Sequence, residues 1–222
     1  MLFTTLNFLF FLVLTFILYW TLFNKNVKNQ NFFIFIISIF FYGFFNWKFL
    51  ILLLISSLST FTAGYFINKF NYENSKDSIF KRKVILWFSL LVNLGILFYF
   101  KYFNFFAENY NSIGDVEYFS ADVALPLAIS FYTLQQIAFL VDYYQKTISE
   151  ELNLKKYFGF VMFFPQLIAG PIVHYKYLTS QFTNNIYRID YRNISLGLLL
   201  ISIGLFKKVV LGDNLAPFVN FG

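Results

Sequence analysis

Long apolar runs constrain the fold of this chain more strongly than any other feature of its sequence. Residues 2–23 contain no charged side chain, and a helix of that length can cross about 30 Å of hydrocarbon. Further apolar runs follow, separated by short polar loops. We therefore predict an all-α protein, a polytopic integral membrane helical bundle that forms a single transmembrane domain over residues 1–222. The predicted spans are residues 2–23, 32–45, 49–67, 84–100 and 125–144.

The composition supports this prediction and excludes several kinds of function. Of the 222 residues, 59% are hydrophobic and 13% are charged, whereas a soluble domain carries roughly 25% charged residues. The chain has no cysteine and a single histidine, so neither disulfides nor a His/Cys zinc site is expected. The net charge of +6 could indicate nucleic-acid binding, but the basic residues form no stripe and lie in loops. The expected partner is the lipid bilayer and not a nucleic acid.

The charges of the loops predict how the chain crosses the membrane. Loops 24–31 and 68–83 are basic, whereas loop 104–124 holds four acidic residues and no Lys or Arg. Because cytoplasmic loops carry an excess of Lys and Arg, both basic loops should be cytoplasmic and the N-terminus should lie outside. The first apolar run has no preceding basic residue and no small-residue cleavage site, so we expect a retained span rather than a signal peptide.

The apolar run at residues 157–173 is interrupted in a way that the earlier runs are not. Its second part, residues 163–173, reads F-F-P-Q-L-I-A-G-P-I-V. Pro165 and Pro171 lack a backbone N–H, and Gly170 adds backbone freedom. Basic segments flank the run on both sides, so we predict a re-entrant or broken hairpin. Such backbone persists in a membrane only where protein covers it or where it lines a polar cavity, which points to substrate handling.

Polar side chains in the predicted span 125–144 fall on two faces of a helix. Ser130, Thr133 and Gln136 share one face, and Gln135 and Asp142 share another. These side chains could form hydrogen bonds between helices, which is common in membrane bundles. They could instead form the polar wall of a substrate path. The sequence leaves both interpretations open.

The last apolar stretch, residues 194–211, contains two lysines. Residues 194–206 are apolar but too few to span a bilayer without distortion. We therefore expect an oblique segment, with Lys207 and Lys208 reaching the cytoplasmic headgroups.

Three blocks of the sequence resemble a known family. Residues 125–135 read L-P-L-A-I-S-F-Y-T-L-Q and are similar to the P-L-G-I-S-F-Y-T-F-Q signature of membrane-bound O-acyltransferases of the alginate O-acetylation type. Val141-Asp142 falls where that family has V-D-x-Y. Residues 163–173 match the family's F-F-P-Q-L-I-A-G-P-I-V, and residues 204–216 resemble its G-L-F-K-K-V-V-I-A-D-N-L-A. The three blocks occur in the family's order and cover most of the chain from residue 125 onward.

The resemblance implies a many-helix membrane enzyme of the bacterial cytoplasmic (inner) membrane, of which this chain is expected to be the N-terminal part. Such an enzyme moves an acyl group from a cytoplasmic thioester donor to a hydroxyl of a cell-envelope polysaccharide such as peptidoglycan or alginate. The implied donor is acetyl-CoA or another acyl thioester, with no bound cofactor. A periplasmic acetyltransferase partner is also implied.

The resemblance also bears on the site residues. It places the family's catalytic histidine in the second half of a longer chain, so no catalytic residue is expected among these 222 except, as a weak candidate, His174. Alginate enzymes usually carry Arg at that position, and His174 is closer to the peptidoglycan branch. Lys176, Arg188, Lys207 and Lys208 are candidates for donor phosphates, although anchoring at the cytoplasmic surface explains each of them without a ligand and is the favoured explanation. The channel or donor-side candidates are Ser130, Thr133, Gln135, Gln136, Asp142, Pro165, Gln166, Gly170, Pro171, Lys176, Lys207 and Lys208.

Two other functions are compatible with the same pattern. A transporter or flippase could use the broken segment to pass an envelope precursor without chemistry, and its cargo would cross unmodified. A non-catalytic membrane scaffold left by a broken gene would also keep the apolar runs, although the well-preserved motif blocks argue against it.

Overall fold

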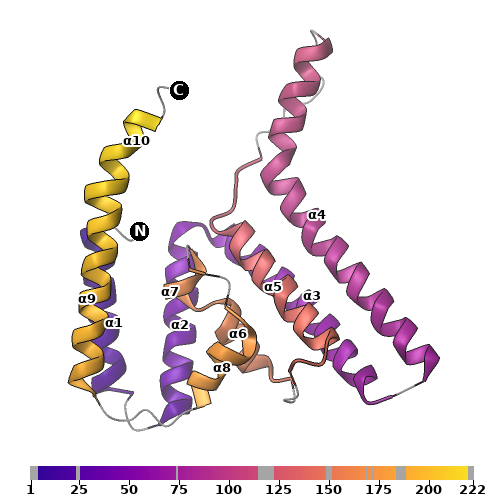
Figure 1. Cartoon of the computed structure of the whole chain (residues 1–222), viewed down its shortest axis with the longest axis horizontal. Coiled ribbons are helices and arrows are strands. Elements are labelled where there is room, and N and C mark those ends of the chain that lie inside the picture. Colours follow the sequence, from indigo (N-terminus) through magenta and orange to yellow (C-terminus); the bar gives the residue numbers. More distant parts are fainter. Residues whose placement is uncertain are drawn as a thin grey trace. The chain divides into compact units, whose positions relative to one another are not determined.

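The structure is a computed structural model that describes residues 5–23, 26–73, 75–114, 123–148, 152–168, 170–171, 173–183 and 189–219. Over these residues every regular element is a helix (Figure 1). The prediction of an all-α chain is therefore confirmed. Contacts divide the chain into two units, residues 34–183 and residues 1–33 with 184–222, and each unit is described by itself.

Four helical stretches of the described chain are long and apolar enough to cross a membrane. They lie at Val27–Phe45, Trp47–Asn71, Lys76–Ser112 and Tyr191–Ala216. Their side chains are mostly exposed, as expected where lipid replaces protein as the apolar surrounding. The chain is thus membrane-embedded. α1 (Leu6–Thr21) is apolar but shorter.

The unit at residues 34–183 is built around three helices. α3 (Trp47–Asn71), α4 (Lys76–Gly114) and α5 (Ile129–Tyr144) pack against one another, and α5 lies beside α3 (Figure 1). α2 (Val27–Phe45) leads into this unit. The predicted span starts at Leu125, but α5 begins four residues later, at Ile129. Ala128 has a left-handed backbone with φ 60°, which is incompatible with a right-handed helix, so the helix cannot start before Ile129.

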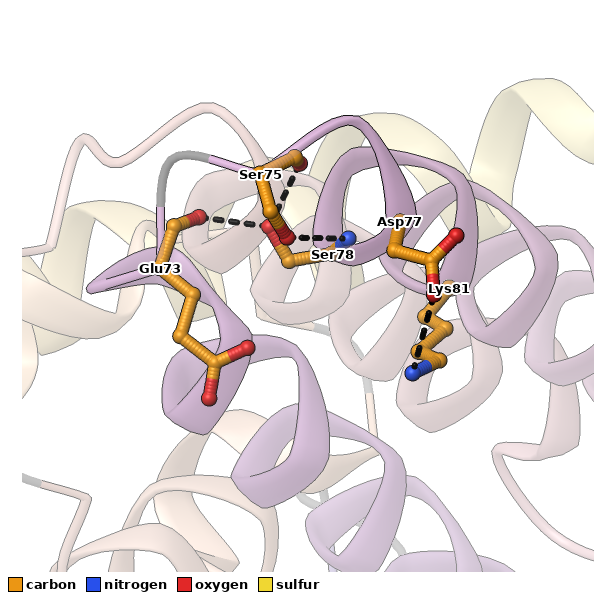
Figure 2. A network of polar contacts seen from close by, with 5 residues as sticks. All are labelled: Glu73, Ser75, Asp77, Ser78 and Lys81. Atoms are coloured by element: carbon orange, nitrogen blue, oxygen red, sulfur yellow. Dashed lines mark hydrogen bonds and ion pairs between the residues drawn. The ribbon is translucent and has the colours of Figure 1, made fainter.

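α4 is much longer than the predicted span at residues 84–100. Polar residues extend the helix beyond the apolar run at both ends, to Lys76 and Gly114. Figure 2 shows how the first turn is stabilised: the Ser75 hydroxyl accepts a hydrogen bond from the backbone N–H of Ser78 at 3.1 Å. This is the geometry of a helix N-cap.

The same turn carries a second group of polar contacts. The Ser78 hydroxyl donates to the backbone carbonyl of Glu73 at 2.6 Å, and Asp77 pairs with Lys81 at 3.7 Å, one turn later (Figure 2). Asp77 also lies at the positive end of the helix dipole. These contacts let α4 start in a polar segment before it becomes apolar.

The break predicted at residues 157–173 is present. α6 (Leu154–Val161) is followed by a short α7 (Phe164–Leu167), and α8 begins separately at Tyr175 and runs to Thr183. The chain is therefore discontinuous where its prolines and glycine predict it to be. Whether the segment enters and leaves the bilayer on one side stays a prediction.

An aromatic cluster holds the broken segment against α5. The ring of Phe139 lies 4.5 Å from that of Tyr157 on α6, 5.2 Å from that of Tyr175 on α8, and 4.9 Å from that of Tyr143. All four side chains are fully buried. Aromatic ring pairs stabilise the folded state by more than the burial of their apolar area alone. α6 and α8 are therefore both held against α5.

The C-terminal stretch is longer than the predicted residues 194–211. α9 (Tyr191–Leu205), the π-helix η1 (Phe206–Gly212) and α10 (Asp213–Val219) follow without interruption. The expectation that this stretch is too short to span considered only the apolar residues 194–206. The helical hydrogen bonds continue through Lys207 and Lys208, so the length suffices. An oblique path stays a prediction.

Candidate functional site

A buried polar network joins α3, α4 and α5, with Gln136 at its centre. The side-chain amide oxygen (Oε1) of Gln136 accepts hydrogen bonds from the hydroxyls of Ser56 and Thr60, each at 2.9 Å. Its amide nitrogen donates to the Ser57 hydroxyl at 3.1 Å. The Asn93 amide of α4 donates to Thr60 at 3.1 Å. Gln136 therefore forms the interhelical hydrogen bonds that its position on a polar face allowed.

The other two residues of that face behave differently. Thr133 is buried, and its hydroxyl has no hydrogen bond within the described chain. Ser130 is half-buried. Neither residue joins the Gln136 network, so for these two the choice between helix packing and a substrate path stays open.

Gln135 compensates for the break in the helix. Its amide nitrogen donates to the backbone carbonyl of Phe160 at 3.0 Å. Phe160 lies in the last turn of α6, where the helix ends and the carbonyl has no intrahelical partner. In an apolar surrounding an unpaired carbonyl is costly. Gln135 thus lets α6 end inside the protein.

The segment after α7 is closed by contacts among three of the candidate residues. The Gln166 amide donates to the carbonyl of Pro171 at 3.0 Å, and the Gly170 N–H donates to the carbonyl of Gln166 at 2.8 Å. A Cβ at position 170 would come within 2.5 Å of the Gln166 Cγ and 2.7 Å of its carbonyl oxygen. Residue 170 therefore has to be glycine, because Gln166 leaves no room for a Cβ. Pro165 lies in the first turn of α7, where proline is tolerated.

A residue that the sequence analysis did not single out anchors α7. The Ser38 hydroxyl of α2 accepts a hydrogen bond from the backbone N–H of Phe164 at 3.2 Å. The ring of Phe164 lies 5.5 Å from that of Phe41 on the same helix. The broken segment is thus held on one side by α2 and on the other by α5.

Asp142 and His174 form the one pair of candidate residues that could take part in proton transfer. The Nδ1 atom of His174 lies 3.1 Å from the Oδ2 atom of Asp142. The Asp142 side chain is 10% exposed, whereas the His174 side chain is 76% exposed. Because a carboxylate only accepts hydrogen bonds, a hydrogen bond in this pair requires the proton on Nδ1 of His174. Nε2 is thereby left for contacts outside the pair.

The end of α5 holds Asp142 in place. The Thr147 N–H donates to the Asp142 carbonyl at 3.0 Å and the Lys146 N–H to the Tyr143 carbonyl at 3.2 Å, with Lys146 at φ 60°. This is a Schellman motif. Arg82 of α4 donates to the Tyr144 carbonyl, and its cation lies over that ring. The terminal carbonyls of α5 are therefore satisfied.

A hollow of about 410 Å³ opens beside the Asp142–His174 pair. Lys176, predicted as a donor-side residue, contributes to its lining and is exposed. The structure thus brings Asp142, His174 and Lys176 together. The remaining lining residues are Thr147, Ile148, Tyr177 and Ser180.

The other two predicted lysines lie in the unit formed by residues 1–33 and 184–222. Lys207 and Lys208 belong to the other unit of the chain, and Lys208 pairs with Asp213. Arg188, three of the acids of loop 104–124 and part of loop 24–31 lie outside the described residues. Their proposed roles are untested.

The sequence analysis did not predict the residues of α3 that form hydrogen bonds with Gln136, although their spacing in the sequence indicates a close helix contact. Ser56, Thr60 and Gly64 are spaced four residues apart, which is the small-residue spacing of close helix contacts in membranes. A Cβ on Gly64 would lie 2.8 Å from the Phe139 ring. The pattern predicts that α3 is approached closely, but not which helix approaches it.

Comparisons with known proteins agree with the resemblance seen in the sequence. Residues 146–222 match the model of MBOAT, the membrane-bound O-acyltransferase family. The chain is 39% identical to a peptidoglycan O-acetyltransferase of Helicobacter pylori, over 100% of this chain and 46% of that protein. It is 31% identical to a probable alginate O-acetylase AlgI of Pseudomonas aeruginosa, over 87% of this chain and 36% of that protein. No solved structure matches.

The chain therefore belongs to the membrane-bound O-acyltransferase family. It spans about half the length of the Helicobacter pylori relative that it matches.

Proposed function

We propose that the protein to which this chain belongs is an O-acetyltransferase of cell-envelope polysaccharide. The observation that carries the proposal is the 39% identity, along the whole chain, to a protein named peptidoglycan O-acetyltransferase. Peptidoglycan is the first acceptor to test, and alginate is the second because the other relatives are named probable alginate O-acetylases.

The donor in this proposal is acetyl-CoA or another acyl thioester that arrives from the cytoplasm. Lys146 directly follows the end of α5, Lys155 and Lys156 lie in the first turn of α6, and Lys176 lies beside the Asp142–His174 pair. Basic segments of membrane proteins face the cytoplasm, and a thioester of coenzyme A is anionic. The proposal also has the N-terminus outside the cytoplasm, as the loop charges predict, and the protein in the bacterial inner membrane, as the family resemblance implies.

The broken segment supports a path for the acyl group. Its freed carbonyls are satisfied by Gln135 and Gln166 rather than by a continuous helix, so non-helical backbone can persist within an apolar bundle. Acyl transfer to a hydroxyl requires a general base. In this proposal that base is a histidine outside these 222 residues, and acetyl groups pass on to a periplasmic partner or directly to the polysaccharide.

The test uses the full-length protein in membrane vesicles of both orientations. Peptidoglycan or alginate is enclosed inside the vesicles, acetyl-CoA labelled in the acetyl group is added outside them, and alkali-labile label on the polysaccharide is counted. Inverted vesicles, whose cytoplasmic face is outward, should transfer label, and right-side-out vesicles should not.

Two results would contradict the proposal. Absence of label on any envelope polysaccharide in inverted vesicles would rule out acetyl transfer from acetyl-CoA. Transport of an unmodified polysaccharide precursor by the same vesicles would favour a flippase. Equal labelling in both orientations would leave the reaction standing but overturn the assignment of the donor side.

A further inference from the structure

We propose that Lys207 lies in the outer half of the membrane, away from the cytoplasm, and that its ammonium group pairs there with a carboxylate on another membrane helix of the full-length protein. The proposal concerns the span Tyr191–Ala216, which consists of α9, η1 and the start of α10. It assigns an interaction surface to this span and does not depend on the proposed acetyl transfer.

The continuity of the span determines how deep Lys207 lies in the bilayer. α9 begins at Tyr191, and the helix continues through η1 into α10 (Figure 1). Arg192 belongs to a basic segment, which the loop charges predict to be cytoplasmic. Lys207 comes 15 residues later, which is about 22 Å along a helix axis. Since the hydrocarbon layer is about 30 Å thick, Lys207 lies roughly 8 Å inside its outer boundary.

This depth differs from the expectation that Lys207 and Lys208 reach the cytoplasmic headgroups. That expectation treated the stretch as a short oblique segment, whereas the helix is continuous and long enough to cross. A lysine side chain cannot reach back to the cytoplasmic surface from the outer half of the bilayer. A charge at this depth is costly unless it faces protein or a water-filled cavity, so Lys207 requires a partner.

The other polar groups near Lys207 are satisfied within the span itself. Lys208 pairs with Asp213. The side-chain amide of Asn214 donates to the backbone carbonyl of Val210 at 2.7 Å, so this carbonyl of the π-helix has a partner. Lys207 differs from these residues, because its ammonium group forms no ion pair within the described part of the chain.

The unit that contains the span has no carboxylate left for Lys207. Residues 1–33 and 184–222 contain two acidic residues, Asp190 and Asp213. Asp213 is the partner of Lys208. Asp190 is the N-cap of α9 and accepts a hydrogen bond from the Arg192 N–H at 2.9 Å, at the opposite end of the span. The partner of Lys207 must therefore come from outside this unit.

The source that we assign is a membrane helix beyond these 222 residues. In the unit at residues 34–183, the apolar runs 34–45, 49–67 and 84–100 contain no acidic residue. Asp142 lies in the last turn of α5 and pairs with His174. The chain covers 46% of the Helicobacter pylori relative. In a full-length protein of that size, more than half of the residues remain to supply the partner helix.

The face of the span beside Lys207 permits another helix to approach closely. Gly197 and Gly204 are seven residues apart and share one face, which Lys208 continues one turn later. A Cβ added to either glycine would meet nothing within 4 Å. Small residues of this kind mark close contacts between membrane helices, as Gly64 does against the Phe139 ring in the other unit. Lys207 borders this face, where a side chain of the partner helix can meet it.

The first experiment determines which end of the span is outside. Tyr191→Cys and Ala216→Cys are introduced singly into the full-length protein, after any cysteine beyond residue 222 has been replaced. A maleimide that does not cross membranes is added to vesicles of each orientation. Tyr191→Cys should react in inverted vesicles and Ala216→Cys in right-side-out vesicles. The reverse pattern would put Lys207 near the cytoplasmic surface and overturn the proposal.

The second experiment tests the ion pair by thermal unfolding of the full-length protein. Lys207→Leu should lower Tm by roughly 6–10 °C, because it leaves a buried carboxylate without its partner. Lys207→Arg keeps the charge and should keep most of the stability. Lys101→Leu is the matched control, since Lys101 is an exposed lysine at the end of the apolar run of α4; it should change Tm little. An unchanged or higher Tm in Lys207→Leu would mean that Lys207 reaches the outer headgroups through lipid, and the pair would not exist.

The third experiment identifies the partner. Lys207→Glu should lower Tm at least as much as Lys207→Leu, because two carboxylates then face each other. In this background each acidic residue of the membrane helices beyond residue 222 is changed in turn to lysine. One such exchange should restore Tm, since it re-forms the pair with the charges swapped. If none does, no helix supplies the carboxylate and the proposal fails.

The polysaccharide acceptor is the rival source of a carboxylate. If Lys207→Leu leaves Tm unchanged but raises the KM for an acidic polysaccharide, the ligand is the acceptor and the helix partner is overturned. Labelling and Tm are both measured without acetyl transfer. A protein that transfers no acetyl group would therefore refute the proposed function and leave the ion pair of Lys207 standing.

Discussion

Ala128 lies at the start of α5 in a conformation that few side chains tolerate. Its backbone has φ 60° and ψ 16°, in the left-handed region. For a residue with a Cβ this region costs roughly 1–2 kcal/mol. The O-acyltransferase signature quoted above has glycine at this position, whereas this chain has alanine. We therefore expect Ala128→Gly to stabilise the folded protein.

The size of the effect follows from two opposing terms. Glycine removes a strain of roughly 1–2 kcal/mol in the folded state. It also raises the entropy of the unfolded chain, which lowers the free energy of unfolding by roughly 0.5–1 kcal/mol. The net gain is therefore between about 0 and 1.5 kcal/mol, with a midpoint of about 0.75 kcal/mol. For a domain of this size a gain of 1 kcal/mol raises Tm by about 2–4 °C, so the expected rise is one to a few degrees.

The assay is thermal unfolding of the purified full-length protein, followed by tryptophan fluorescence. Ala138→Gly is the matched control, because Ala138 lies inside α5 and has a helical backbone. There the same substitution should destabilise by about 1 kcal/mol. If Ala128→Gly lowers Tm as much as Ala138→Gly, the left-handed backbone at residue 128 is not a source of strain and the reasoning fails.

Three further substitutions test other parts of the unit, each by the same thermal unfolding. Gly170→Ala should destabilise by about 1–3 kcal/mol, because its Cβ would overlap Gln166; Gly95→Ala, with open space around it, should not. Gln136→Leu should destabilise by about 2 kcal/mol, because it removes three hydrogen bonds that average about 0.6 kcal/mol each in membranes; the exposed Gln145→Leu should have little effect. Lys146→Gly should stabilise by about 0.5–1 kcal/mol by relieving φ 60°, whereas Lys146→Ala, which also removes the charge, should not.

The break in the chain at residues 157–173 could be predicted because its cause is local. Proline and glycine act on their own backbone, so Pro165, Gly170 and Pro171 identify the discontinuity without any knowledge of neighbours. The apolar runs predict long helices for the same reason, because apolarity is a property of each run by itself. The ends of α4 were missed, since polar residues continue a helix as readily as they end one.

The contacts that build the candidate site could not be predicted, because they join distant parts of the chain. Asp142 and His174 are 32 positions apart, and their pairing depends on how α8 returns to α5. Gln135 and Gln136 are adjacent, yet one supports the broken segment and the other joins three helices. Helical periodicity assigns them to different faces but does not say what each face meets.

The Gln136 network also implies an order of assembly. Thr60 and Asn93 can meet as soon as α4 has been synthesised, whereas the partners of Gln136 on α3 precede it by 76 to 80 positions. α3 and α4 can therefore pair before α5 is synthesised. α5, with only 16 residues and a glutamine at its centre, meets a surface of hydroxyl groups already in the membrane. Hydrogen bonds to α3 can thus help to hold α5 in the membrane, in addition to the apolarity of α5 itself.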